Sequence, residues 1–247
     1  MRTAKRPAVT MPGDEMANRL SAIDWHQVAG DLDTRGCALV SQLLAPSECA
    51  AVAAMYADDG IFRSRVLMQR HGSGRGEYKY FSYPLPGLIT GLRTFAYPCL
   101  ATVANRWNAA MAIDVRYPEQ HSRFIEHCHA AGQTRPTCLL LHYGTDDYNC
   151  LHQDLYGAQV FPLQMAILLS DAERDFTGGE FILTEQRPRT QSRAEVPLRR
   201  GDAVIFAVHQ RPMTGLRGTY RVKHRHGVGR VRSGHRHTLG IIFHDAL

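Results

Sequence analysis

The sequence predicts an α+β protein in which an N-terminal helical part supports a β-rich C-terminal part. Three observations support this prediction. Helical apolar spacing and helix-capping residues are concentrated before residue 113. After Pro136 the chain consists of short runs rich in β-branched and aromatic residues, separated by Gly, Asp and Pro turns. With 247 residues, 44% of them hydrophobic, the chain can bury one large core, and several short strands indicate a sandwich or barrel.

The first elements follow from local signals. Residues 1–20 carry positive charge but no long apolar segment, which predicts a flexible tail and not a secretory signal. Residues 21–33 predict a helix with Ser21 as its N-cap. Pro46 then opens a second helix, which we expect to end at Gly60.

Further along, residues 61–69 predict a strand. Between residues 88 and 112 apolar side chains recur at helical spacing, with an interruption expected at Pro98. Residues 114–136 are mixed and polar and predict a linker. We therefore expect one domain over residues 21–247, with helical support and a lid over 21–136 and the β-rich core over 137–247.

Bulk composition narrows the class of protein. Lys and Arg number 29 against 23 Asp and Glu, and the net charge of +6 favours anionic partners. The six cysteines form no C-x-x-C pair, which predicts buried thiols and neither a disulfide framework nor a zinc cluster. No apolar run approaches the roughly 20 residues that span a bilayer. These features predict a cytoplasmic protein without a membrane segment; they leave its oligomeric state open.

A candidate metal site begins in the run LHQDLYG. If this run is extended, His152 and Asp154 project to the same face of a strand and can bind one ion together. A second histidine from elsewhere would complete two imidazoles and one carboxylate, the facial triad of non-haem Fe(II) oxygenases. Such a triad leaves three positions open, enough for a bidentate 2-oxo acid and dioxygen.

Several later histidines compete to be the third ligand. We choose His226, because Gly227 and Val228 follow it and because it stands ten residues before Arg236. The alternative is His224, which shares its strand face. On either choice the sequence predicts a triad that includes His152 and Asp154.

Arg236 and Tyr143 are the candidates for holding 2-oxoglutarate. Arg236 opens an apolar strand, where an inward-pointing, unpaired guanidinium is costly. A bound dicarboxylate would pair with it, because the guanidinium fork matches a carboxylate. Tyr143 stands nine residues before His152, and its hydroxyl could donate to the same carboxylate. Each could instead be structural, Arg236 on an exposed basic edge and Tyr143 in the core.

The motifs follow one another in a characteristic order, which is Tyr143, His152-x-Asp154, GGEF at 178–181, GDAVIF at 201–206, His226 and Gly234-x-Arg236-x-x-Leu239. In this order the chain resembles the Fe(II)/2-oxoglutarate oxygenase superfamily. More closely, it resembles a bacterial family assigned to oxidative demethylation of alkylated nucleic acid. The resemblance implies a double-stranded β-helix, or jelly roll, with supporting helices. It also implies Fe(II) and 2-oxoglutarate as cofactors, and succinate, CO₂ and formaldehyde as products.

The likeness to AlkB-type repair enzymes is partial. Their Asn-x-Tyr before the metal pair reads Leu141-His142-Tyr143 here, so the Asn is missing. A single well-placed Arg236 is also more similar to prolyl-hydroxylase-like enzymes. This departure keeps a second hypothesis open, a hydroxylase of a protein side chain or small molecule.

Basic and aromatic residues indicate where alkylated DNA or RNA could bind. Between residues 61 and 84, cations alternate with stackable rings, which suits a phosphate backbone and an unstacked base. The residues are Arg63, Arg65, Arg70, Arg75, Lys79, Tyr78, Tyr80, Phe81 and Tyr83. A second basic run comprises Arg217, Arg221, Lys223, Arg225, Arg230 and Arg232. The same residues could grip an acidic peptide or metabolite, and a third hypothesis is a jelly-roll binding module without activity.

Overall fold

The computed structural model of the chain describes residues 13–187, 189–216 and 218–247. Its helices are α1 (Gly13–Ser21), α2 (Trp25–Arg35), α3 (Pro46–Ala54), α4 (Gly87–Ala110) and α5 (His121–Ala130), with 3-10 turns η1 (Met55–Ala57), η2 (Asp59–Ile61) and η3 (Met68–His71). Its strands are β1 (Cys37–Val40), β2 (Phe62–Leu67), β3 (Gly74–Arg75), β4 (Glu77–Phe81), β5 (Leu139–Tyr143), β6 (Tyr148–His152), β7 (Leu163–Leu168), β8 (Phe176–Gly178), β9 (Phe181–Gln186), β10 (Gln191–Val196), β11 (Ala203–Ala207), β12 (Gln210–Gly215), β13 (Gly218–Val228), β14 (Val231–Gly234) and β15 (Arg236–Ile242).

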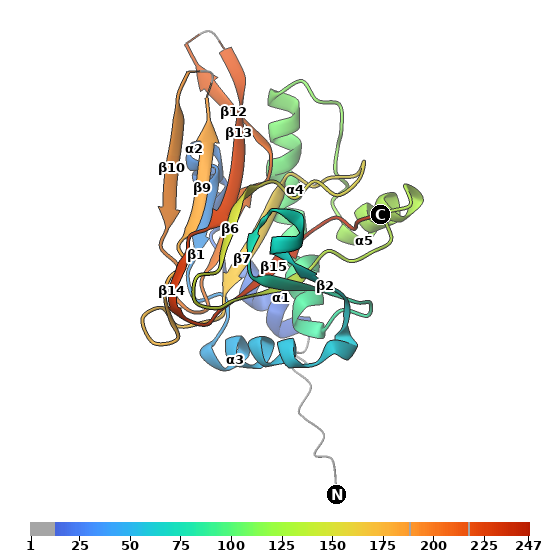
Figure 1. Cartoon of the computed structure of the whole chain (residues 1–247). Coiled ribbons are helices and arrows are strands. Elements are labelled where there is room, and N and C mark those ends of the chain that lie inside the picture. Colours follow the sequence, from blue (N-terminus) through green and yellow to red (C-terminus); the bar gives the residue numbers. More distant parts are fainter. Residues whose placement is uncertain (1–12, 188, 217) are drawn as a thin grey trace, which may run out of the picture.

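Two large antiparallel sheets form the centre of the molecule (Figure 1). The major sheet has seven strands in the order β1-β11-β7-β15-β5-β4-β2. The minor sheet has the order β10-β9-β13-β6-β3, and β12 pairs with β13. A small cluster that includes Phe181 and Leu183 of β9 and Phe206 of β11 packs between the two sheets. This arrangement confirms the predicted α+β fold with a jelly-roll core.

Helices cover the other face of the major sheet. The largest apolar cluster joins side chains of α4, such as Leu92 and Trp107, to Leu239 and Ile241 of β15. Each of these side chains is at most 1% exposed. Burial of four large side chains of this kind stabilises the fold by roughly 1.5–3 kcal/mol each. The helices therefore pack against one face of the major sheet, and the opposite face of this sheet lines a cavity.

The N-terminal expectations need two corrections. Residues 13–20 were expected in a flexible tail, but they belong to α1, where Met16 and Leu20 are 1% exposed. Residues 1–12 lie outside the described residues. Ser21 is not the N-cap of the next helix, because its hydroxyl donates to the Asn18 carbonyl at the end of α1. Asp24 caps α2 instead, its carboxylate accepting the backbone N–H of Gln27 at 2.9 Å.

Helix boundaries in the middle of the chain also differ from expectation. The helix at Pro46 ends at Ala54, not Gly60, and continues as two 3-10 turns. Helix α4 runs through Pro98 without a break, because buried side chains on both sides of it override the local cost of about 3 kcal/mol. The expected linker over 114–136 contains α5. Strands β1, β2 and β4 join the major sheet, so the part before residue 137 supplies sheet as well as support.

Two other expectations can be compared with the structure. The six cysteines were expected to be buried thiols, and all six are free; Cys49, Cys128 and Cys138 are buried, but Cys37 and Cys99 are half-buried and Cys150 is exposed. Among the described residues, no helix is both long and apolar enough to cross a bilayer.

Two buried histidines predict a loss of stability in acid. Burial, and secondarily the charge of Arg93, lowers the pKa of both His121 and His244 to about 4. Between pH 6.5 and 4 the unfolded chain therefore binds two protons that the folded chain does not. Stability should fall as pH decreases through this window, by up to about 2–3 kcal/mol per pH unit. Urea titrations from pH 7.5 to 4.5 measure the slope. A His121→Gln, His244→Gln double variant with an unchanged slope would contradict this assignment.

Candidate active site

The two predicted histidine ligands face each other across neighbouring strands. His152 ends β6 and pairs directly with His226 of β13. Directly paired residues share a face of the sheet, with Cβ atoms about 4.5–5.5 Å apart. The ring centroids of His152 and His226 are 4.2 Å apart. Strand pairing thus brings together two residues that are 74 positions apart in the chain.

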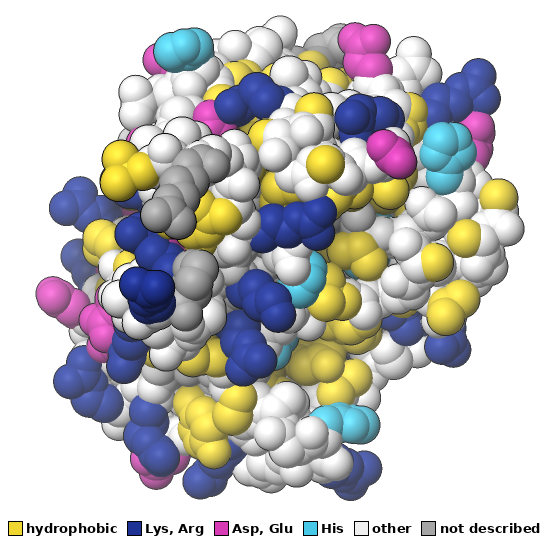
Figure 2. Space-filling model, turned by 90° about the horizontal axis from the view of Figure 1, so that it is seen from above, with side chains coloured by type: hydrophobic (Ala, Val, Ile, Leu, Met, Phe, Trp, Pro, Cys, Tyr) yellow, Lys and Arg dark blue, Asp and Glu magenta, His cyan; other side chains and the backbone are white. Residues whose placement is uncertain are grey.

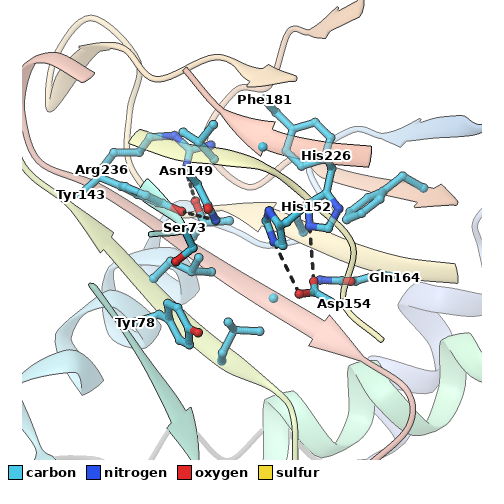
Figure 3. Close-up of a pocket in the computed structure, with 18 of the residues that line it drawn as sticks. Ser73, Tyr78, Tyr143, Asn149, His152, Asp154, Gln164, Phe181, His226 and Arg236 are labelled. Atoms are coloured by element: carbon cyan, nitrogen blue, oxygen red, sulfur yellow. Dashed lines mark hydrogen bonds and ion pairs between the residues drawn. The ribbon is translucent and has the colours of Figure 1, made fainter. Parts of the chain in front are cut away.

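Asp154 completes the cluster from the segment that follows β6. Its carboxylate oxygens lie 3.5 Å from His152 Nε2 and 3.3 Å from His226 Nε2. One ligand atom from each of the three residues lies within 4.8 Å of the others. Figure 3 shows the three side chains converging at one end of a cavity between the sheets. Two imidazole nitrogens and one carboxylate are a donor set that fits Fe(II).

Hydrogen bonds and charge prepare these groups to bind a cation. His152 Nδ1 lies 2.8 Å from the Cys150 carbonyl, which can only accept, so Nδ1 carries the proton and Nε2 is left for a metal. Burial raises the pKa of Asp154, but hydrogen bonds to both imidazoles outweigh burial and hold that pKa well below its usual value. Burial, then the charge on His152, lowers the pKa of His226, whereas for His152 burial is outweighed by the hydrogen bond and charge of Asp154, which raise its pKa. Metal binding requires an ionised Asp154 and neutral imidazoles, so a bound cation would displace the proton that His152 shares with Asp154.

Arg236 and Tyr143 lie at the other end of the same cavity (Figure 3). Arg236 is 1% exposed, its Nε has no hydrogen-bond partner among the described residues, and its guanidinium donates to the Thr238 hydroxyl. Burial lowers its pKa to about 10. The guanidinium carbon is 5.6 Å from the centre of the Tyr143 ring. A buried guanidinium with an unused donor fits a dicarboxylate that reaches from the metal cluster.

The GGEF motif makes room for this arginine. Gly179 has a φ of +64°, and a Cβ at this position would lie 2.9 Å from Arg236 Cδ. Only glycine is compatible with both the backbone conformation and the close approach. The motif therefore belongs to the same site as Arg236.

The alternative third ligand, His224, lies elsewhere. It is 0% exposed, and its Nε2 is 3.2 Å from Arg211 Nε and 3.3 Å from Glu185 Oε2. Burial lowers its pKa to about 4. Of the two histidines on this face of β13, the structure brings only His226 to His152 and Asp154.

Most cations between residues 61 and 84 are already paired. Arg65 binds Glu77, Arg75 binds Asp147, and Lys79 is 5% exposed and binds Asp59. The aromatic side chains of this stretch lie in different environments. Phe81 is in the core, whereas Tyr78 lines the cavity. This stretch thus forms part of the cavity wall, and it offers few free cations to a phosphate backbone.

Sequence reasoning missed several polar side chains in or beside the site, among them Ser73, Gln164 and Thr238 of the cavity wall. Tyr156 donates to Asp154 Oδ1 at 2.7 Å, and Gln153 donates to the His224 carbonyl at 2.6 Å. Asn149 lines the cavity and lies 3.5 Å from the Tyr143 hydroxyl. An Asn was noted as missing near Tyr143; the structure supplies one from β6, the next strand along the chain, which belongs to the minor sheet. Proximity to the H-x-D motif was the only signal that could have found Asn149, Gln153 and Tyr156.

Tyr156 offers a test of how the carboxylate is oriented. Its phenol donates to Asp154 Oδ1 and so helps to orient the carboxylate that would hold the metal. Tyr156→Phe should weaken metal binding by about 10–100-fold, the range found for outer hydrogen-bond partners of metal ligands. Isothermal titration with Mn(II) measures this. Tyr80 donates to Tyr156 at 3.0 Å and does not touch Asp154, so Tyr80→Phe is the matched control. Equal Mn(II) affinities in the Tyr156 variant and the wild type would remove the role of this phenol.

Comparison with solved structures places the fold. The chain is similar to a Pseudomonas putida prolyl-4-hydroxylase, with a TM-score of 0.53 and 14% identity over 90% of this chain and 99% of that one. It is also similar to a Trichoplax adhaerens prolyl hydroxylase solved with a hypoxia inducible factor peptide, with a TM-score of 0.57 and 13% identity over 96% of this chain and 94% of that one. For a Burkholderia pseudomallei oxidoreductase of the 2OG-Fe(II) oxygenase family, the TM-score is 0.51 and the identity is 16%, over 91% of this chain and 93% of that one. At these identities the likeness establishes the fold.

Comparison with sequences establishes the family. A family model described as "Oxygenase, catalysing oxidative methylation of damaged DNA" matches residues 76–246. An uncharacterized protein of Mycobacterium tuberculosis is 48% identical over 167 residues, which cover 67% of this chain and 72% of that protein.

Together, the fold and the His-Asp-His cluster define a 2-oxoglutarate-dependent, non-haem Fe(II) oxygenase. Within that class, the chain belongs to the oxygenase family just described, whose model spans most of its length. Fe(II) and 2-oxoglutarate are therefore its cofactors.

Proposed function

We propose that this protein oxidises N-methyl groups on alkylated nucleic acid and releases formaldehyde, succinate and CO₂. The observation that carries the proposal is the match over residues 76–246 to a family described as acting on damaged DNA. Oxidation of an N-methyl carbon gives a hemiaminal, which loses formaldehyde and leaves the unmethylated base. The net basic charge of +6 is compatible with a polyanionic substrate.

In this proposal His152, Asp154 and His226 hold Fe(II), which supplies the oxidising chemistry when it is bound with dioxygen. Arg236 and the Tyr143 hydroxyl bind the distal carboxylate of 2-oxoglutarate. Because these two residues line the end of the cavity away from the metal cluster, they fix the direction in which the oxo acid lies. The buried walls of the cavity exclude water from the reacting groups.

We further propose that residues 21–247 act as one catalytic domain. Supporting this, β4, from the part before residue 137, pairs with β5, and Tyr78 of β4 lines the same cavity as His152. Six free thiols are compatible with a cytoplasmic site of action.

The experiment that tests the function is a product screen. Fe(II)-loaded protein with 2-oxoglutarate is given methylated DNA, methylated RNA, proline-containing peptides or small acids, and succinate and formaldehyde are both measured. Formaldehyde from a methylated oligonucleotide, matched by succinate, supports demethylation. Succinate coupled to a hydroxylated peptide or small molecule, without formaldehyde, would replace the proposal with the hydroxylase hypothesis. Absence of succinate with every substrate would favour a binding module.

A further inference from the structure

The outer face of the minor sheet carries a row of exposed cations. Arg221, Lys223 and Arg225 are all exposed and alternate along β13. The residues between and beside them, including His224 and His226, are buried and point toward the inside of the fold. One strand therefore presents metal-site residues on its inner face and positive charge on its outer face.

Lys223 and Arg225 differ from most cations of this protein in lacking an acidic partner. Among the described residues, Arg and Lys side chains at many other places lie within 4.0 Å of a carboxylate, as Arg65 does with Glu77 and Arg230 with Asp146. No described carboxylate lies that close to Lys223 or Arg225. Unpaired, exposed cations of this kind remain available to an anionic partner.

The strands on either side of β13 add neutral polar groups to this face. Lys223 pairs with Gln186 of β9 on one side and with Gln210 of β12 on the other. Arg225 pairs with Thr184, which in turn pairs with Arg193 of β10. Directly paired residues share a face, so two glutamines and a buried threonine flank the cations. The Gln186 amide donates to the Arg187 carbonyl and the Thr184 hydroxyl to the Arg225 carbonyl.

A single carboxylate lies on the same face in these pairings. Glu195 pairs with Ile182, two positions from Thr184 along β9, and it binds Arg193 at 2.9 Å. This acid therefore offsets Arg193 and leaves the β13 cations unopposed. Figure 2 shows Lys and Arg side chains gathered on the left, the side on which Figure 1 places β10, β9, β13 and β12.

We propose that this β13 cation row, made up of Arg221, Lys223 and Arg225, binds the phosphodiester backbone of the DNA substrate. The inference rests on the function proposed above and adds to it a surface outside the catalytic cavity. Alternate residues of a strand are about 6.6–6.8 Å apart, a repeat similar to that of phosphates along an extended nucleic-acid strand. Cations with such a repeat contact successive phosphates without reading sequence.

The test is DNA binding by anaerobic protein loaded with Fe(II) and 2-oxoglutarate. The probe is a fluorescein-labelled single-stranded 15-mer with one N-methylated base, and anisotropy is measured from 50 to 300 mM salt. We expect Lys223→Gln, Arg225→Gln to weaken binding on the order of tenfold at low salt. The slope of log affinity against log salt should become shallower by about 1.4, or 0.7 for each lost phosphate contact.

The matched control removes two charges from a different part of the molecule. Arg35 and Arg123 are exposed and lie on α2 and α5, so Arg35→Gln, Arg123→Gln lowers the net charge equally. Wild-type affinity in the control, together with the loss in the β13 variant, supports the proposal. Equal losses in both variants, or no loss in either, would overturn it. Wild-type protein that fails to bind the oligonucleotide would also overturn it.

Formaldehyde release separates this proposal from the proposed function. If the β13 variant demethylates the oligonucleotide with wild-type affinity, the cation row is wrong and the function stands. If the wild type binds DNA through the row but forms no formaldehyde, the demethylase proposal fails while the surface remains.

Discussion

Replacing His226 with alanine is expected to abolish turnover and weaken metal binding by on the order of 100-fold. A structural zinc ion with four ligands binds with a free energy of about 10–16 kcal/mol. One strong ligand therefore contributes about 3 kcal/mol, which corresponds to roughly 100-fold in affinity. In the variant two of the three ligands remain, His152 and Asp154, whose Nε2 and Oδ1 atoms lie 3.5 Å apart. Anaerobic titration with Fe(II), or with Mn(II) followed by electron paramagnetic resonance, measures the affinity.

His224→Gln is the matched control for this experiment. His224 lies two residues earlier on the same buried face of β13, but its partners are Arg211 and Glu185. Glutamine retains a polar group for them. The control should keep metal affinity near wild type, although it can lose some stability. If the control loses the metal and His226→Ala retains it, the ligand assignment is wrong.

Replacing Arg236 with methionine is expected to have opposite effects on ligand binding and on the ligand-free fold. Losing a buried charged partner should raise the 2-oxoglutarate requirement on the order of 100-fold, or about 3 kcal/mol. Without the ligand, however, the variant should unfold at a higher temperature. Arg236 is 1% exposed, and among the described residues its guanidinium lies beside the Thr238 hydroxyl and the Tyr143 and Phe176 rings, so methionine replaces a buried charge that has no acidic partner there with apolar volume.

Thermal unfolding with and without 2-oxoglutarate distinguishes these effects. At 100 times its dissociation constant, the ligand should stabilise the metal-loaded wild type by about 2.7 kcal/mol. The same concentration should leave the Arg236→Met variant almost unchanged, while its Mn(II) affinity stays near that of the wild type. Equal stabilisation of both proteins by 2-oxoglutarate would remove the role of Arg236.

Strand alternation and motif order together selected the candidate metal ligands, although β6 ends at His152 and Asp154 lies in the segment after it. His152 and Asp154 were chosen because alternate positions share a face, and the structure places them together. The choice of His226 over His224 depended on motif order, since both lie on the same face of β13. What separates them is the pairing register, which sets His226 opposite His152. A register between distant strands cannot be derived from local periodicity.

Asn149 shows where alternation fails. It stands three residues before His152, so a regular strand would place the two side chains on opposite faces. Between the paired positions His226–His152 and Val228–Asn149, however, one strand advances by two residues and the other by three. This bulge brings Asn149 into the cavity with His152. The wrong helix boundaries near the N-terminus also reflect non-local structure. Contacts with the rest of the fold, and not local signals, decided where those helices begin and end.

The alternation of buried and exposed side chains along β13 has a consequence for how this enzyme can vary. A single-residue insertion or deletion in β13 between its turn and His226 would invert the strand's two-residue periodicity. The His226 imidazole would then point to solvent, and the Arg225 guanidinium would point into the cavity. Homologues should therefore change length in this hairpin only by even steps, or by acquiring a compensating irregularity in the adjoining strand.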